Sequence, residues 1–277
     1  MQRRLTPRGL ERKHQLMAYA TQRFAEQGYH PTSVAEIVDA FAKAMTPKTR
    51  LVMVSHTVYK TGLITPIKEL ADLAHKHGAL IVADSAHGVG MMNLSLPATG
   101  VDAWASSPYK WLGAPAGSGV FYIRRDVQER IWPTIASGNW DYKNAHRFET
   151  LSQRSDALIQ GLGEAVEFQN RIGRPRIERR IQTLASHLKD GLSAIPKVRL
   201  HTNTDTTLSA GLTAFSIAGV PGESIVNHVR EKYNIVIRTI GDKASNSLGV
   251  RVSTHVWISL EDVNLLLRGV DELARRA

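Results

Sequence analysis

The sequence predicts an α/β fold with a mostly parallel sheet, and two kinds of pattern indicate it. Three short apolar runs, Arg50 to Ser55, Ala79 to Ala83 and Val101 to Ala105, are bounded by polar or turn residues. Such runs are typical of strands that are buried on both faces of a parallel sheet. Amphipathic segments with helical spacing alternate with strand-like runs along the chain. The 277 residues, 43% of them hydrophobic, can form a large core and favour roughly two domains.

The segment between the first two strands is predicted to be a helix. Thr65 can cap it, Pro66 suits its first position, and Gly78 suits its end. Its apolar face comprises Ile67, Leu70, Ala71 and Ala74. The result is a strand, helix, strand unit, and a further strand is expected at Gly119 to Ile123 after a glycine-rich stretch.

Each of the first three strands ends at a residue that is able to do chemistry. His56 follows the first strand, Asp84 the second, and Ser106, Ser107 and Lys110 the third. Ligands of open α/β sheets bind beyond the carboxyl ends of the strands, so these groups should converge. A carboxylate and a lysine at neighbouring strand ends are suited to hold a pyridine ring and to form an imine with its aldehyde.

Each of these residues also has an ordinary structural interpretation. A lysine after a strand is usually a solvated loop residue, and an aspartate such as Asp84 is favoured as a helix cap. Two further residues that can do chemistry are open to the same interpretation: His87, three residues after Asp84, can be a hydrogen-bonded core histidine, and Arg251 can be a surface residue of an edge strand. The motifs taken together favour the chemical interpretation.

Four stretches occur in a fixed order: SHTVYKTG from Ser55, PIKELADLAHKHGALIVADSAHG from Pro66, GVDAWASSPYKWLGAPAGSGVFYIRRD from Gly100 and GVRVSTHVWISLEDVNLLLRGVDEL from Gly249. They resemble the class V aminotransferases, a group of fold type I pyridoxal 5'-phosphate enzymes that includes cysteine desulfurases and isopenicillin N epimerase-like proteins. The resemblance extends from about Glu36 to the C-terminus. It implies a partial large domain with a mostly parallel sheet and a small C-terminal α/β domain.

The resemblance also implies a role for each candidate residue. Lys110 would hold the cofactor as a Schiff base and later move the α-proton of the substrate. Asp84 would pair with the pyridinium nitrogen and keep it protonated. His87 would contact the ring or its 3'-oxygen, and Ser107 would bind the phosphate. Arg251 would bind the α-carboxylate of the substrate, a task suited to a planar bidentate donor.

Three positions depart from the family pattern. Tyr109 stands where the family more often has histidine, although its hydroxyl can still donate one hydrogen bond to the phosphate. Tyr59 stands near an asparagine that many members direct at the 3'-oxygen. Leu151, Ser152 and Gln153 replace the common Gly-Thr-Gln, which reaches the phosphate of the partner subunit, and Ser152 keeps a hydroxyl. The resemblance thus implies a homodimer with Ser152 near the cofactor.

The front of the chain departs further. Family members carry a long segment there, with a glycine-rich phosphate turn at a helix N-terminus and a residue that stacks on the ring. Arg8 to Ala40 instead resembles the start of a TetR-type helix-turn-helix domain, with a predicted capping box of Ser33 and Glu36. One helical face would comprise Leu16, Met17, Ala20 and Phe24. A generic helical hairpin is the alternative, and specific nucleic-acid binding is not expected because the recognition helix is missing.

Composition narrows the choice of function. The sequence has no cysteine, which rules out disulfides, thiolate metal sites and a desulfurase that passes sulfur to its own thiolate. It has no run of eighteen apolar residues and no export signal, so a cytoplasmic protein without a membrane span is expected. The formal net charge of +10 is spread along the chain, which suits an anionic cofactor and a solvated surface better than a nucleic-acid site.

The predicted organisation is a helical TetR-like segment over residues 1–33, a partial cofactor-binding domain over 34–170 and a small domain over 171–277. The small domain would begin with a long helix from Arg171 to Pro196. Its strands are expected at Leu212 to Ile217, Ile235 to Arg238 and Val250 to Ser253, and its other helices at Gly222 to Tyr233 and Leu260 to Arg275.

We expect a pyridoxal phosphate enzyme that acts on an amino acid or amine by transamination or α-proton transfer. The alternatives are a truncated, inactive homologue and a TetR-like regulator or interaction module.

Overall fold

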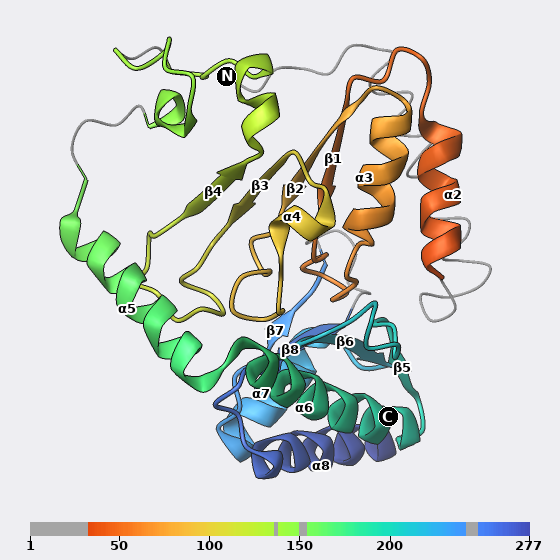
Figure 1. Cartoon of the computed structure of the whole chain (residues 1–277). Helices are drawn as coiled ribbons and strands as arrows, with labels where there is room; N and C mark the ends of the chain where they lie inside the picture. Colours follow the sequence, from red (N-terminus) through yellow and green to blue (C-terminus); the bar gives the residue numbers. More distant parts are fainter. Residues whose placement is uncertain (1–32, 136–137, 150–153, 242–248) are drawn as a thin grey trace.

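The computed structural model describes residues 33–135, 138–149, 154–241 and 249–277 of the chain. Two four-stranded sheets organise these residues, and Figure 1 shows them one above the other. The first sheet has the order β1-β2-β3-β4, with the strands β1 (Leu51–Ser55), β2 (Leu80–Asp84), β3 (Ala103–Ser106) and β4 (Val120–Ile123). The second has the order β5-β6-β8-β7, with β5 (Val198–Leu200), β6 (Leu212–Ile217), β7 (Arg238–Thr239) and β8 (Val250–Ser253).

Strand direction separates the two sheets. β1, β2 and β3 are parallel to one another, and only β4 runs antiparallel to its neighbour β3. All pairs of the second sheet are antiparallel. The predicted α/β fold with a mostly parallel first sheet is therefore confirmed, and each of its four strands lies within two residues of its expected bounds.

The helices α2 (Val34–Ala44) and α3 (Ile67–Lys76) lie side by side against one face of the first sheet (Figure 1). The four predicted apolar residues of α3 are all buried. Its start differs from the prediction, because Pro66 is the N-cap and Thr65 Oγ1 donates to the carbonyl of Ser55 at 2.6 Å. Thr65 therefore ties the helix to the end of β1 instead of capping it. The predicted capping box of α2 is confirmed, because Ser33 and Glu36 each accept from the other's backbone N–H.

The opposite face of the first sheet is only partly covered by the described residues: Ala103 and Ile123 are buried there with Val127, whereas β1 is open. Val52 and Val54 of β1 are buried on the α3 side, whereas Leu51 and Met53 alternate with them and are exposed, Met53 by 70%. Phe121 of β4 is also exposed. Parallel sheets are ordinarily covered on both faces, so this face is suited to further polypeptide.

Three long helices pack around the second sheet: α6 (Arg174–Ala194), α7 (Gly222–Tyr233) and α8 (Leu260–Arg276). The predicted apolar face of α6 is buried, and it comprises Ile177, Ile181, Leu184, Leu188 and Leu192. The predicted helix from Arg171 to Pro196 is in fact interrupted, since Gly173 has φ 96° and ends a separate helix, α5 (Asp156–Ile172). α5 runs along the side of the molecule from the first sheet towards the second (Figure 1).

Three shorter helices complete the description: α4 (Leu96–Thr99), η1 (Arg125–Arg130) and η2 (Ala145–Phe148). No helix among the described residues is long and apolar enough to cross a membrane.

The predicted domain boundaries after residues 33 and 170 stay predictions. The TetR-like segment, with its face of Leu16, Met17, Ala20 and Phe24, lies outside the described residues apart from Ser33.

Candidate functional site

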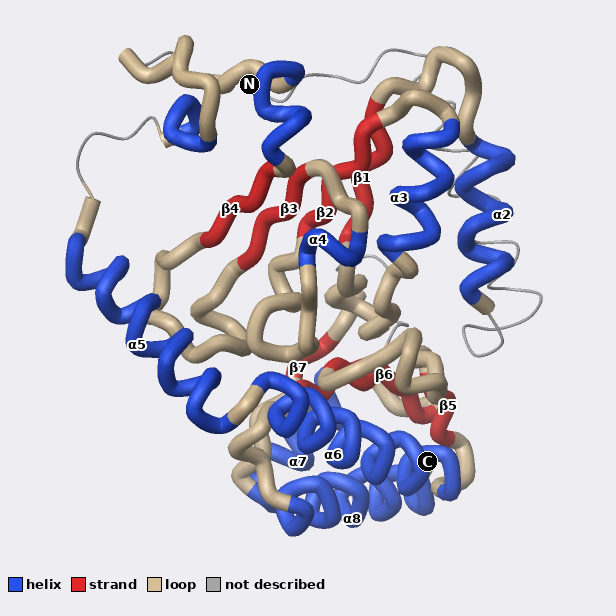
Figure 2. The backbone as a smooth tube through the Cα atoms, viewed as in Figure 1, coloured by secondary structure: helices blue, strands red, loops and turns tan. Residues whose placement is uncertain are grey.

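The loops that follow β1, β2 and β3 meet the second sheet, as the tube of Figure 2 shows. Arg251 Nη1 of β8 donates to the carbonyl of Tyr59 at 3.0 Å, and Ile64 N donates to the carbonyl of Leu208 at 2.8 Å. Residues of the second half of the chain therefore border the edge of the first sheet at which the site is expected. A site at this edge would draw its residues from both sheets.

Asp84 is the last residue of β2 and is exposed at the end of the strand. Its Oδ1 atom accepts the backbone N–H of Ala86 at 3.1 Å, which leaves acceptor capacity on the carboxylate for a ligand. The turn beneath it is fixed from both sides. His56 Nδ1 lies 2.9 Å from Ser85 Oγ, and Ser106 Oγ donates to the carbonyl of Ser85 at 2.7 Å.

His87 is the residue at which the candidate groups come together. Its pKa is lowered to about 4, first by burial and then by the positive charges of Lys110 and Arg251, while the carboxylate of Asp84 acts in the opposite sense. Charges act this way only over short distances. The charges of Asp84, Lys110 and Arg251 therefore act on His87, and the order of strand ends predicts this proximity for Asp84 and Lys110.

Lys110 lies in the turn that directly follows β3 and is half-buried. Its backbone N–H donates to the carbonyl of Ser107 at 3.1 Å, so the predicted phosphate ligands Ser107 and Tyr109 belong to the same turn. Lys110 Nζ is 6.0 Å from the centre of the Tyr109 ring. Ser152 lies outside the described residues, so its contact with the phosphate stays a prediction.

Arg251 supplies unused hydrogen-bonding capacity. Its Nε atom is buried and has no hydrogen-bond partner among the described residues. Arg238 lies directly opposite on β7, and burial together with this second positive charge lowers the pKa of Arg251. None of the ion pairs among the described residues involves either arginine. A pair of like charges is destabilising on its own, so this position is suited to a carboxylate ligand.

Trp111 and His255 also lie in this region, although the sequence does not predict them as part of the site. Trp111 is 3% exposed, and its indole nitrogen donates to His87 Nδ1 at 3.0 Å. The ring of His255 stacks on that of Trp111, with centroids 5.0 Å apart. The one sequence feature that points to Trp111 is its bulk in a turn that is otherwise rich in small residues.

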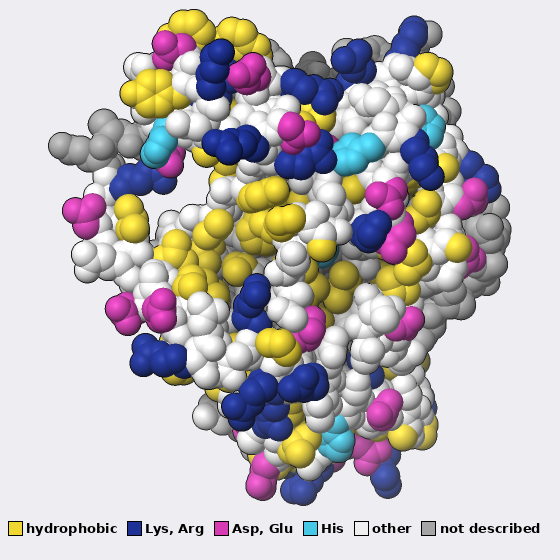
Figure 3. All heavy atoms as spheres, in the orientation of Figure 1, with side chains coloured by type: hydrophobic (Ala, Val, Ile, Leu, Met, Phe, Trp, Pro, Cys, Tyr) yellow, Lys and Arg dark blue, Asp and Glu magenta, His cyan; other side chains and the backbone are white. Residues whose placement is uncertain are grey.

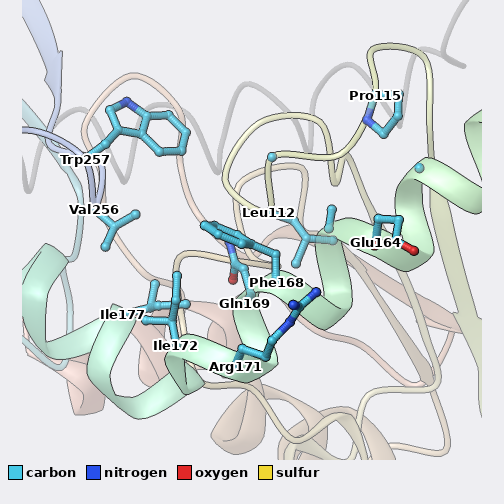
Figure 4. Close-up of a pocket in the computed structure, with 13 residues that line it drawn as sticks. Leu112, Pro115, Glu164, Phe168, Gln169, Arg171, Ile172, Ile177, Val256 and Trp257 are labelled. Atoms are coloured by element: carbon cyan, nitrogen blue, oxygen red, sulfur yellow. The ribbon is translucent and has the colours of Figure 1, made fainter.

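A cavity of about 560 Å³ lies next to this region, between α5, the loop from Leu112 to Pro115 and the loop at Val256 and Trp257 (Figure 4). Its lining is mostly apolar, with Glu164 and Arg171 as charged members, and includes neither Asp84 nor Lys110. A second cavity of about 480 Å³ is lined largely by apolar residues of the loop after β2 and of α5. Hydrophobic side chains also gather in the middle of the face that Figure 3 shows. Neither cavity contains the candidate site.

Comparison with known proteins gives the family. The model of the aminotransferase class-V family matches residues 29–266. The chain belongs to this family. It is 29% identical to isopenicillin N epimerase of Amycolatopsis lactamdurans over 258 residues, which are 87% of this chain and 64% of that protein. It is 27% identical to a probable cysteine desulfurase of Halalkalibacterium halodurans, over 85% of this chain and 61% of that protein. The chain therefore spans less than two thirds of these curated relatives.

Solved structures agree on the fold. The apo structure of a cysteine desulfurase from Thermococcus onnurineus NA1 superposes with a TM-score of 0.77 at 23% identity, and the match covers 93% of this chain and 69% of that one. A mutant of C-DES with glycine covalently linked to its PLP cofactor gives a TM-score of 0.74 at 25% identity, over 92% and 71% of the two chains. The expected fold of the fold type I PLP-dependent enzymes is confirmed.

Proposed function

We propose that this chain binds pyridoxal 5'-phosphate and acts on an amino acid or amine by transamination or α-proton transfer. The observation that carries the proposal is that Asp84, at the end of β2, is paired with Ala105 of β3, and the turn after β3 carries Lys110. Family membership supports it, and so does the covalently linked cofactor of the structurally similar C-DES.

The described residues fit the ring side of this cofactor. Asp84 has free acceptor capacity at a strand end, and its negative charge favours the protonated form of a ring nitrogen. Ser107 and Tyr109 would donate hydrogen bonds to the phosphate from the turn that carries Lys110. When bound, the cofactor supplies an electron-withdrawing ring that stabilises negative charge at the α-carbon.

The chain's own residues would then do two things. Arg251 would orient the substrate, since its buried Nε and its remaining Nη protons can bind the α-carboxylate. Lys110 Nζ, which would first hold the cofactor covalently, would take the α-proton in its uncharged form and return it. The place where a proton is added decides between the two reactions: the opposite face of the α-carbon in epimerisation, a cofactor atom in transamination.

The test is hydrogen exchange at the α-carbon. The purified chain with added cofactor is incubated with a panel of amino acids in D₂O, and proton NMR follows the loss of the α-hydrogen while keto-acid production is assayed in parallel. We expect exchange that disappears in Lys110→Arg. Keto acid together with exchange indicates transamination, and exchange with racemised amino acid indicates epimerisation. Absence of exchange with every amino acid at saturating cofactor contradicts the proposal and favours an inactive homologue.

We further propose a cytoplasmic homodimer. The partly open face of the first sheet, with Leu51, Met53 and Phe121 exposed, supports an interface of some kind, because a parallel sheet is ordinarily covered on both faces. Light scattering of the protein as it elutes from a size-exclusion column gives the mass of the species in solution. A single species at the monomer mass across micromolar concentrations would contradict the dimer.

A further inference from the structure

Trp111 contacts the candidate site through its indole nitrogen. The N–H of that nitrogen donates to Nδ1 of His87 at 3.0 Å, and the two rings meet edge to face with centroids 6.5 Å apart. The tryptophan side chain is buried, so this donor has no access to solvent as an alternative partner. Burial of the indole donor makes the bond costly to leave unmade.

The direction of this bond decides where the proton of His87 lies. An indole nitrogen is a donor only, so the nitrogen that receives its hydrogen bond must carry a lone pair. Nδ1 of His87 is therefore unprotonated, and the single proton of the neutral ring lies on Nε2. The lowered pKa of His87, about 4, agrees with a ring that is neutral near pH 7.

Trp111 is itself held from three sides. Its carbonyl accepts a hydrogen bond from Gln169 Nε2 at 2.8 Å and another from His255 Nε2 at 3.0 Å. His255 Nδ1 accepts the N–H of Val256, so Nε2 is the protonated nitrogen of that ring and can donate to Trp111. Gly211 leaves room for the indole, because a Cβ atom there would lie 2.5 Å from the ring. Gln169 and Trp257, whose ring stacks on His255, appear together in Figure 4.

We propose that Trp111 is a positioning residue that fixes the proton of His87 on Nε2 and thereby makes His87 a hydrogen-bond donor beside Lys110. Trp111 follows Lys110 directly in the chain, so the same residue also ties the lysine turn to α5 and to the second sheet. The benefit for catalysis rests on the proposed function. The position of the proton does not, because it is a property of the chain alone.

The charged groups that face His87 come from three elements: Asp84 from the end of β2, Lys110 from the turn after β3 and Arg251 from β8. All three would remain in a Trp111→Phe variant, which also keeps an aromatic ring to stack on His255. The variant removes the N–H donor with the smallest change in shape. A hydrogen bond to the neutral form of an imidazole lowers its pKa, so its loss should raise the pKa of His87.

The experiment is NMR of the full chain without cofactor, labelled with ¹⁵N in the histidine rings. His87→Gln identifies the His87 signals among those of the 11 histidines. We expect a wild-type ring with the proton on Nε2 that stays neutral down to about pH 5, given its lowered pKa. In Trp111→Phe the pKa of His87 should rise by about one pH unit, or tenfold in proton affinity, the amount that one neutral hydrogen bond supplies.

Trp104→Phe is the matched control. Trp104 is buried to a similar degree, 4% exposed, but its indole nitrogen has no hydrogen-bond partner among the described residues. A proton on Nδ1 in the wild-type chain overturns the proposal, and this measurement needs no variant. An unchanged pKa in Trp111→Phe, or an equal rise in Trp104→Phe, overturns it too. The position of the proton and the pKa of His87 can be measured even if the chain never binds pyridoxal phosphate. The experiment therefore distinguishes the failure of this inference from the failure of the proposed function.

Discussion

Asp84 is the one carboxylate among the described groups whose charge acts on His87, where it opposes Lys110 and Arg251. A carboxylate that pairs with a protonated ring nitrogen forms a charge-assisted hydrogen bond, worth about 1.5–3 kcal/mol. We therefore expect Asp84→Asn to bind the cofactor roughly 10- to 100-fold more weakly, measured by absorbance titration. Asparagine still accepts the N–H of Ala86, so the turn should survive.

Two further variants separate charge from structure at this position. Asp84→Glu keeps the charge and should retain part of the affinity, whereas Asp84→Ala should lose both the charge and the turn bond. Cofactor affinity that is equal in wild type, Asp84→Asn and Asp84→Ala would show that Asp84 only stabilises its own turn.

Lys110 is expected to be the residue that becomes covalently attached to the cofactor. After addition of pyridoxal phosphate and reduction with borohydride, mass spectrometry of peptides should find the label on Lys110. Lys110→Ala should abolish the specific label, while Lys60→Ala should leave it in place. Lys60 is a suitable control because it lies in the neighbouring loop after β1, beside the ring of Tyr59. Labelling that is confined to other lysines would contradict the assignment.

The sequence predicts residues at strand ends better than residues that reach the site through tertiary contacts. Asp84 and Lys110 can be proposed because strand order alone brings carboxyl ends together, whereas His87 follows only from the family resemblance. Trp111 and Arg238 could not, since their roles depend on contacts with His87 and Arg251 that are distant in sequence. The roles of the proposed site residues remain predictions, although the charges of Asp84, Lys110 and Arg251 all act on His87.

The sequence predicts helices with a regular spacing of apolar residues well. It predicts poorly the elements whose structure depends on contacts with other parts of the chain. α7 has the predicted bounds, and the buried face of α6 was read from its spacing. α5 was missed because its glycines lower helix propensity, yet Gly161 is required, since a Cβ there would lie 2.5 Å from Pro115. β5 has three residues, too few to show an alternating pattern.

The loop after β2 packs directly against the lysine turn, and Gly90 makes this possible. A Cβ atom at Gly90 would lie 2.3 Å from Leu112 N and 2.4 Å from the carbonyl carbon of Trp111. Both neighbours are backbone atoms, which cannot move as a flexible side chain can. We expect Gly90→Ala to displace the lysine turn, to lower the free energy of unfolding by more than the roughly 1–2 kcal/mol cost of positive φ, and to weaken cofactor binding.

Gly113→Ala is the matched control for that prediction. Gly113 also has a positive φ, 79° against 84° at Gly90, but its Cβ would meet no atom within 4 Å. This variant should show only the backbone cost and bind cofactor like the wild type. Urea unfolding and cofactor titration on both variants provide the measurements. Equal losses in the two variants would show that the packing of Gly90 on the lysine turn is unimportant.

At the scale of the whole molecule, three histidines lie just beyond strand ends, and one of them, His255, joins the two sheets. His56 lies at the end of β1, His87 beyond β2, and His255 between the second sheet and Trp111. The pKa of each is lowered to about 4, in every case first by burial. His87 and His255 must stay neutral to keep these contacts, because Nδ1 of each ring accepts a hydrogen bond.

This arrangement predicts a loss of stability in mild acid. A histidine of the unfolded chain takes up a proton near pH 6.5, whereas these three in the folded chain do so only near pH 4. The unfolded state therefore binds more protons between these values, and stability falls as the pH drops from about 6.5 towards 4. For His56, which is 4% exposed, the shift corresponds to about 3 kcal/mol, a large part of an ordinary folding free energy.

Urea unfolding at intervals between pH 8 and pH 5 measures this effect. We expect a plateau above about pH 7 and a steep decline below it, with a smaller decline in His56→Gln than in wild type. His77→Gln is the control, because His77 is exposed and should leave the slope unchanged. The pKa of Glu272 is lowered to about 2, chiefly by Lys232 and Tyr233, so this residue affects stability only below about pH 4.5. Its effect can therefore be separated from that of the histidines. A free energy of unfolding that is constant from pH 8 to pH 5 would show that these histidines are not held neutral by the fold.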